Sequence, residues 1–99
     1  TFSVMLAAGL EGIEKKYDLP APVEENVYEM SNEEKTRRGI KTLPPDLFEA
    51  LQLTKQSKLV KKALGDHVFD AFIKNKEFEW DLYRTQVTEW EKQRYLPIL

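Results

Sequence analysis

The chain has 99 residues, 41% of them hydrophobic and 32% charged, so it can form one modest domain or part of a larger one. Fifteen basic and seventeen acidic residues give a formal net charge of −2, which leaves no positive field to hold nucleic acid. No apolar stretch approaches the ~20 residues needed to cross a membrane, and no segment resembles a secretory leader. The absence of cysteine excludes disulfides and thiolate metal sites. We therefore expect a cytoplasmic protein without a membrane or nucleic-acid partner.

The first segment has the apolar spacing of a helix. Phe2, Met5, Leu6, Gly9 and Ile13 fall on one helical face. A glycine inside a helix costs up to about 1 kcal/mol relative to alanine, so close approach of another backbone is the expected compensation. No partner for this face is obvious elsewhere in the sequence. Because the chain opens inside this apolar run, we expect it to be cut from a longer protein, whereas its last residue could be a natural end.

The helical period stops between Asp18 and Met30. Prolines and acidic residues in this stretch predict an extended connection at the surface. Ser31 and Glu34 then have the spacing of a capping box, in which each side chain binds the backbone N–H of the other residue. A short helix should follow and end at Gly39.

Three further helices are expected in the second half of the chain. Pro44 and Pro45 exclude helix before Asp46, and a short helix should follow. Ser57 can cap a second helix that runs through Leu64. The longest helix should extend from about Asp66 to Thr85. Its shared apolar face comprises Phe69, Phe72, Ile73, Trp80 and Tyr83, and Phe78 and Leu82 form an adjacent pair.

Thr88 and Glu91 form a second capping box, which opens a terminal helix that Pro97 ends. No segment has a convincing strand pattern. The predicted fold class is therefore mainly α.

No arrangement of residues for catalysis or metal binding is evident. His67 is the only histidine, and we expect it to be a partly exposed helix residue paired with a carboxylate. The four glycines are too dispersed to form a phosphate-binding loop. Glu77, Glu79 and Asp81 alternate along the longest predicted helix, so their carboxylates should point in different directions rather than converge on a cation. We assign no catalytic, cofactor-binding or metal-binding residue to this chain.

Three stretches, in the same order and spacing, resemble the end of type I glutamine synthetases of bacteria and archaea. They are residues 5–16 (MLAAGLEGIEKK), 22–30 (PVEENVYEM) and 79–91 (EWDLYRTQVTEWE). With the intervening residues 40–44 (IKTLP), the similarity extends over essentially the whole chain.

This resemblance implies that residues 1–99 are the carboxy-terminal helical part of an α+β catalytic domain. The family joins ammonia to glutamate, using ATP and Mg or Mn, in a cytoplasmic homo-dodecamer. Its metal-binding glutamates, histidine and phosphate-binding arginines precede the segment that this chain resembles. We therefore expect a structural role without activity of the chain alone, and a regulatory role is a further hypothesis. The expected partners are the missing part of the domain, neighbouring subunits and nitrogen-regulatory proteins.

The resemblance also draws attention to Tyr28. One subclass of the family is adenylylated on a tyrosine in the segment Asn-Leu-Tyr-Asp-Leu-Pro, and Tyr28 has the matching position in residues 26–31 (NVYEMS). The three residues after Tyr28 resemble the subclass that is not modified. We therefore expect an unmodified Tyr28 that anchors the extended arm, with its ring packed and its hydroxyl in water.

Glu79 matches a glutamate in a region that lies near the active site of the family. A carboxylate there could pair with an arginine of the adjoining subunit and tune feedback inhibition by glutamine. An ordinary exposed helix carboxylate is the alternative.

Trp80, Tyr83, Trp90 and Tyr95 should form a docking face onto the missing domain. The competing hypothesis for the whole chain is a free-standing helical interaction module. That module should be a hydrophilic monomer that unfolds cooperatively.

Overall fold

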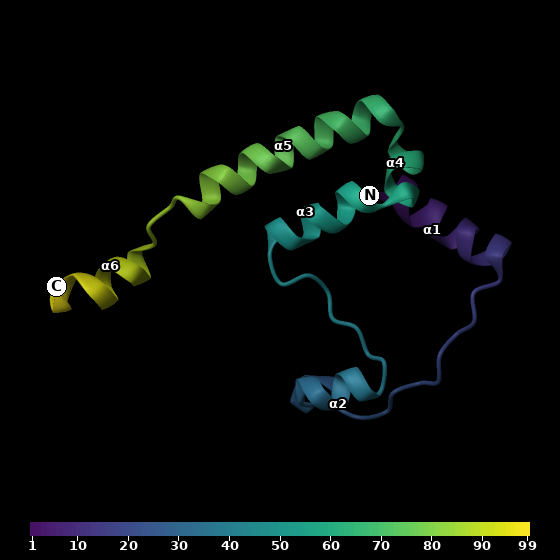
Figure 1. Cartoon of the computed structure of the whole chain (residues 1–99), viewed down its shortest axis with the longest axis horizontal. Coiled ribbons are helices and arrows are strands. Elements are labelled where there is room, and N and C mark those ends of the chain that lie inside the picture. The colour runs from purple at the N-terminus through teal and green to yellow at the C-terminus, as the bar shows by residue number, and fades with distance from the viewer.

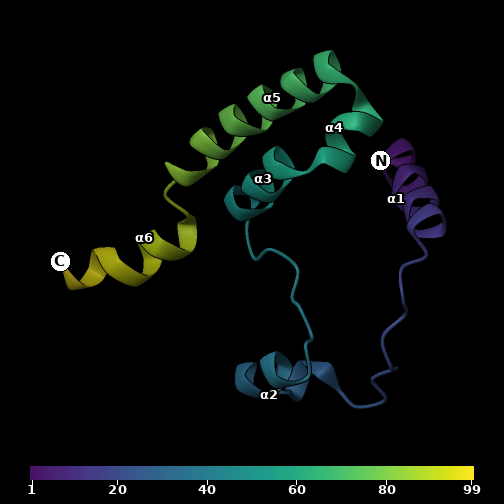
Figure 2. The same ribbon diagram turned by 45° about the vertical axis from the view of Figure 1, so that its right-hand side comes forward.

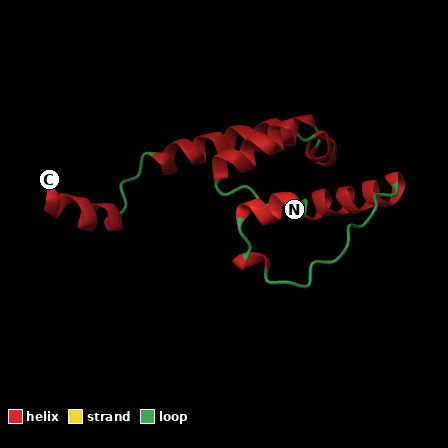
Figure 3. Cartoon of the chain, turned by 60° about the horizontal axis from the view of Figure 1, so that its bottom comes forward, coloured by secondary structure: helices red, strands yellow, loops and turns green.

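The computed structural model describes residues 1–99 and contains helices joined by loops, with no strand, as the mainly α prediction requires. Figures 1 and 3 show these helices in an open arrangement. The elements are α1 (Phe2–Lys15), η1 (Val27–Glu29), α2 (Asn32–Arg37), α3 (Leu47–Gln56), α4 (Lys58–Leu64), α5 (Asp66–Arg84), α6 (Glu89–Tyr95) and η2 (Leu96–Ile98), where η denotes a 3₁₀ turn.

Helix α1 packs against α4, although about forty residues separate the two in sequence. Ala7, Leu10 and Glu11 of α1 line one side of the contact region, and Leu59 and Ala63 of α4 line the other. Figures 1 and 2 both place α1 beside α4 and away from α6.

The arm between α1 and α2 is extended, as predicted, except for the short turn η1. Ser31 caps α2, because its Oγ accepts a hydrogen bond from the Glu34 backbone N–H at 3.2 Å. The second half of the predicted capping box is wrong: the Glu34 carboxylate lies 3.0 Å from Arg38 instead of binding the Ser31 N–H. Gly39 follows the helix with a φ of 72°, the left-handed conformation that ends helices.

Helices α3, α4 and α5 form a helical hairpin in which α3 and α5 run side by side in opposite directions (Figures 1 and 2). Asp46 Oδ1 caps α3 through the Glu49 N–H at 2.8 Å, and Ser57 caps α4, as predicted for Ser57. Leu51 on α3 and Phe69 on α5 are the two buried residues of the chain. The core of this hairpin is therefore very small.

Helix α6 begins with the predicted capping box. The Glu91 N–H donates to Thr88 Oγ1 at 3.2 Å, and Glu91 Oε2 accepts from the Thr88 N–H at 2.7 Å. The α-helix ends before Pro97, and the 3₁₀ turn η2 follows. Figure 1 shows this terminal piece projecting away from the hairpin.

The molecule is elongated, with a radius of gyration of 18.8 Å and extents of 58 × 42 × 19 Å. A compact chain of this length would have a radius of about 13 Å. Its accessible surface is 9203 Å², whereas size scaling for 11.6 kDa gives about 5,800 Å². About 3,400 Å² of surface is therefore exposed beyond that of an ordinary monomer. None of the helices combines the length and the apolar character that crossing a membrane requires.

Candidate functional site

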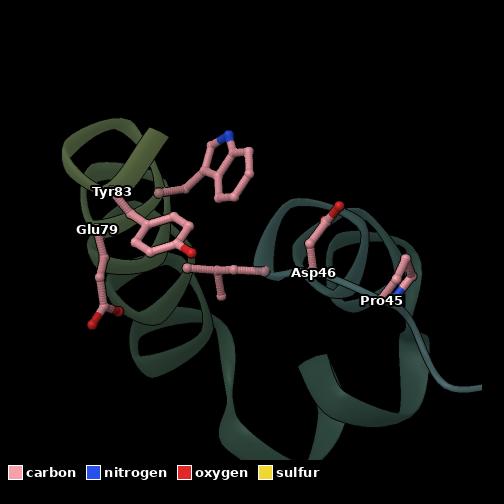
Figure 4. Close-up of a pocket in the computed structure, with 6 residues that line it drawn as sticks. Pro45, Asp46, Glu79 and Tyr83 are labelled. Carbon is pink, nitrogen blue, oxygen red and sulfur yellow. The ribbon is translucent and has the colours of Figure 1, made fainter. Parts of the chain in front are cut away.

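A groove lies between the start of α3 and the second half of α5 (Figure 4). Its volume is about 360 Å³. The lining residues are Pro45, Asp46, Leu47, Glu79, Trp80 and Tyr83. The groove exists because the two prolines end the arm at the point where Asp46 starts α3, opposite the last turns of α5.

Glu79 lies on the α5 side of this groove, across from Asp46 and Pro45 in Figure 4. Its Oε2 is 2.6 Å from Lys76 Nζ one turn earlier, and just over half of its side chain is exposed. Asp46 is occupied in capping α3. The groove therefore presents two carboxylates: Asp46, which caps α3, and Glu79, which is paired with Lys76.

The other carboxylates of α5 point in different directions, as predicted. Glu77 pairs with Lys55 across the hairpin, whereas Asp81 pairs with Arg84 on its own helix at 2.8 Å. No three histidine or acidic residues come together in a way that could hold a metal ion. The expected carboxylate partner of His67 is absent: His67 is exposed and makes no ion pair, so that prediction is wrong.

The aromatic residues of the second half form two clusters rather than one face. Trp80 packs between Phe48 and Tyr83, with ring centroids 5.8 and 6.0 Å away. Trp90 and Tyr95 meet edge to face on the terminal piece, at 6.0 Å. The Trp80 ring therefore packs inside the hairpin against Phe48 of α3. The sequence pattern of α5 alone does not reveal this contact.

Tyr28 projects from the turn η1 and is 93% exposed. Asn26 Oδ1 fixes the turn by accepting a hydrogen bond from the Tyr28 N–H at 3.1 Å. The expected packed ring is therefore wrong for this chain, since no neighbouring segment covers it.

Arg38 ties the arm to α2, a contact that the sequence reading missed. One guanidinium nitrogen lies 3.1 and 3.2 Å from the two Glu25 oxygens and 3.0 Å from Glu34 Oε1. Hydrogen bonding to Glu25, reinforced by the charges of both carboxylates, raises the pKa of Arg38. Thirteen residues separate Arg38 from Glu25, so no local pattern signals the pair. The contacts of Arg38 with Glu25 and Glu34 hold the turn that carries Tyr28 close to α2.

Comparison with known proteins identifies the family. A model of the glutamine synthetase catalytic domain matches residues 1–95. A glutamine synthetase of Staphylococcus epidermidis is 48% identical over 94 residues, and one of Staphylococcus aureus is 47% identical over the same length. Each match covers 95% of this chain but 21% of the relative, so the chain spans about a fifth of the length of these relatives. The chain belongs to the glutamine synthetase family and corresponds to a carboxy-terminal segment of the catalytic domain.

Proposed function

We propose that this chain is a structural part of a glutamine synthetase, packed against the rest of the catalytic domain and supporting its active site. The parent enzyme would join ammonia to glutamate with ATP and release glutamine. The observation that carries the proposal is the exposed apolar surface of the helices, combined with the family match over nearly the whole chain.

The amount of this surface fits a permanent interface. About 3,400 Å² is exposed beyond the expectation for a compact monomer, which exceeds the about 1,000–2,500 Å² that each partner contributes to an obligate interface of about 2,000–5,000 Å² in total. Large side chains of α1, α5 and the terminal piece contribute to it, with Ile13 at 76% and Ile98 at 76% exposure. These exposed apolar side chains support the proposal over a free-standing interaction module, which would need a hydrophilic surface.

The family resemblance implies metal ions and ATP for the parent enzyme, and we propose that both bind outside this chain. No cluster of three potential metal ligands exists, and no glycine-rich loop is present. We therefore assign ATP and Mg or Mn to the part of the parent outside this chain. By the same reasoning, the chain alone should have no ligase activity.

Two regulatory assignments follow from the family resemblance. Glu79 would exchange Lys76 for an arginine of the adjoining subunit and so influence feedback inhibition by glutamine; its position in an open groove supports this role. Tyr28 would remain unmodified, because the residues that follow it differ from those of the adenylylated subclass. The proposed parent is a cytoplasmic homo-dodecamer that can contact nitrogen-regulatory proteins.

The test compares the intact protein with residues 1–99 expressed alone. Glutamine formation from glutamate, ammonia and ATP should occur with the intact protein and be undetectable with the chain alone. The isolated chain should also bind a hydrophobic dye and self-associate in analytical ultracentrifugation. A dye-negative monomer that unfolds cooperatively, together with an inactive intact protein, would establish the interaction module instead.

A further inference from the structure

Helix α1 has apolar residues on two opposite faces, and the chain covers one of them. Ala7 and Glu11 face the region of α4. With 3.6 residues per turn, Gly9 lies about half a turn away from both, on the far side of the helix. Around Gly9 lie Phe2, 87% exposed, and Ile13, 76% exposed. A helix that is apolar on all sides is normally buried on all sides.

Gly9 is the feature that distinguishes this face from an ordinary apolar patch. A Cβ atom built on Gly9 would meet nothing within 4 Å, so no contact within the chain requires a glycine there. Its backbone conformation does not require one either, since φ is not positive. Glycine is less favourable than alanine inside a helix. Close approach of a second backbone would account for the residue, because even a methyl group would then collide.

We propose that the α1 face of Phe2, Leu6, Gly9 and Ile13 docks onto the part of the same catalytic domain that lies outside this chain, with a backbone segment of that part passing directly over Gly9. This inference rests on the proposed function. The occupant follows from length, because the relatives extend about four-fifths of their sequence beyond the matched segment. That remainder is tethered to α1 in the same molecule, which gives it an advantage over a second copy.

The test uses the intact protein and the variant Gly9→Ala. A solvent-facing Gly9→Ala should raise the thermal unfolding midpoint, because alanine is the better helix former. Under the proposal the added methyl group collides with the covering backbone, so the midpoint falls. The reverse exchange at the next position, Ala8→Gly, is the matched control. Ala8→Gly should lower the thermal midpoint because glycine is the poorer helix former. The size of this fall estimates the rise that Gly9→Ala would produce if the face around Gly9 were open to solvent.

Oxidative footprinting supplies a second reading on the unaltered protein. Met5 borders the docking face and is 65% exposed in this chain. Under the proposal it is oxidised at least ten-fold more slowly in the folded intact protein than in urea, and this protection persists in dissociated subunits. Protection that disappears when the subunits separate would assign the face to another copy and overturn the proposal, as would a raised midpoint for Gly9→Ala. Glutamine formation measured on the same wild-type preparation tests the proposed function separately.

Discussion

Leu51→Ala removes three carbon atoms from the centre of the α3–α5 hairpin. Leu51 is 3% exposed and, with Phe69, makes up the buried core of the chain. At about 0.8 kcal/mol per buried methylene, the lost transfer free energy is about 2.4 kcal/mol. Leucine-to-alanine changes in rigid cores reach about 5 kcal/mol, because a cavity remains. The molecule extends 19 Å along its shortest axis, so the surrounding side chains can move into the space. We therefore expect a loss of about 2–3 kcal/mol in the free energy of unfolding.

Leu53→Ala is the matched control, since the same atoms are removed from the same helix. Leu53 is 57% exposed, so its truncation should cost about 1 kcal/mol or less. The assay is amide hydrogen exchange of α3 and α5 in the intact protein, measured by mass spectrometry. Because every 1.4 kcal/mol is a factor of about ten, Leu51→Ala should speed exchange through opening of the hairpin by about 30-fold or more, whereas Leu53→Ala should speed it by about five-fold or less. Equal exchange rates for the two variants would refute the assignment of the core to Leu51.

Four further predictions concern single side chains. Hydrogen bonds from the Thr88 backbone N–H and then its hydroxyl lower the pKa of Glu91 below 4.5. The stabilisation of α6 by the Glu91 carboxylate is therefore complete above pH 4.5 and is lost as pH falls through the lower folded-state pKa. The amide resonance of Thr88 should titrate in that pH range. In a Glu91→Gln variant the same resonance should not titrate. Arg38→Met should increase proteolysis and amide exchange of the arm with little change in the overall stability, because the ion pairs are exposed. Unchanged exchange in the arm would show that the contact of Arg38 with Glu25 does not hold the arm. Incubation of the intact protein with an adenylyltransferase and ATP should leave the mass of the Tyr28 peptide unchanged. Glu79→Lys in the intact enzyme should weaken inhibition by glutamine in steady-state assays, and an unaltered inhibition curve would remove Glu79 from regulation.

Local signals in the sequence predicted most of the helix boundaries. Ser57 and Thr88 cap helices because a side-chain oxygen three residues before a backbone N–H needs no distant partner. Gly39 and Gly65 adopt positive φ at helix ends for the same local reason. The cap of α3 by Asp46 was not predicted, although an Asp that follows two prolines and precedes an apolar run is the usual signal for such a cap.

Contacts between distant residues were not predictable from pattern alone. Arg38 lies four residues after Glu34 and competes locally with the Ser31 N–H for its carboxylate, but its second partner, Glu25, lies thirteen positions earlier and is signalled by no local pattern. The Lys55–Glu77 ion pair depends on α3 and α5 lying side by side, which no helical period encodes. The exposed ring of Tyr28 differs from the prediction, because an aromatic side chain suggests packing but no segment of this chain lies over the ring.

The contact between α1 and α4 closes the intervening residues into a long loop that contains the arm, α2 and α3. The entropy cost of closing such a loop grows slowly, by about 0.6 kcal/mol for each doubling of its length. Insertions in the stretch from Gly39 to Leu43, which lies between helices, would therefore lengthen the loop with little effect on the α1–α4 contact. This excursion can therefore accept added residues at a low cost in stability.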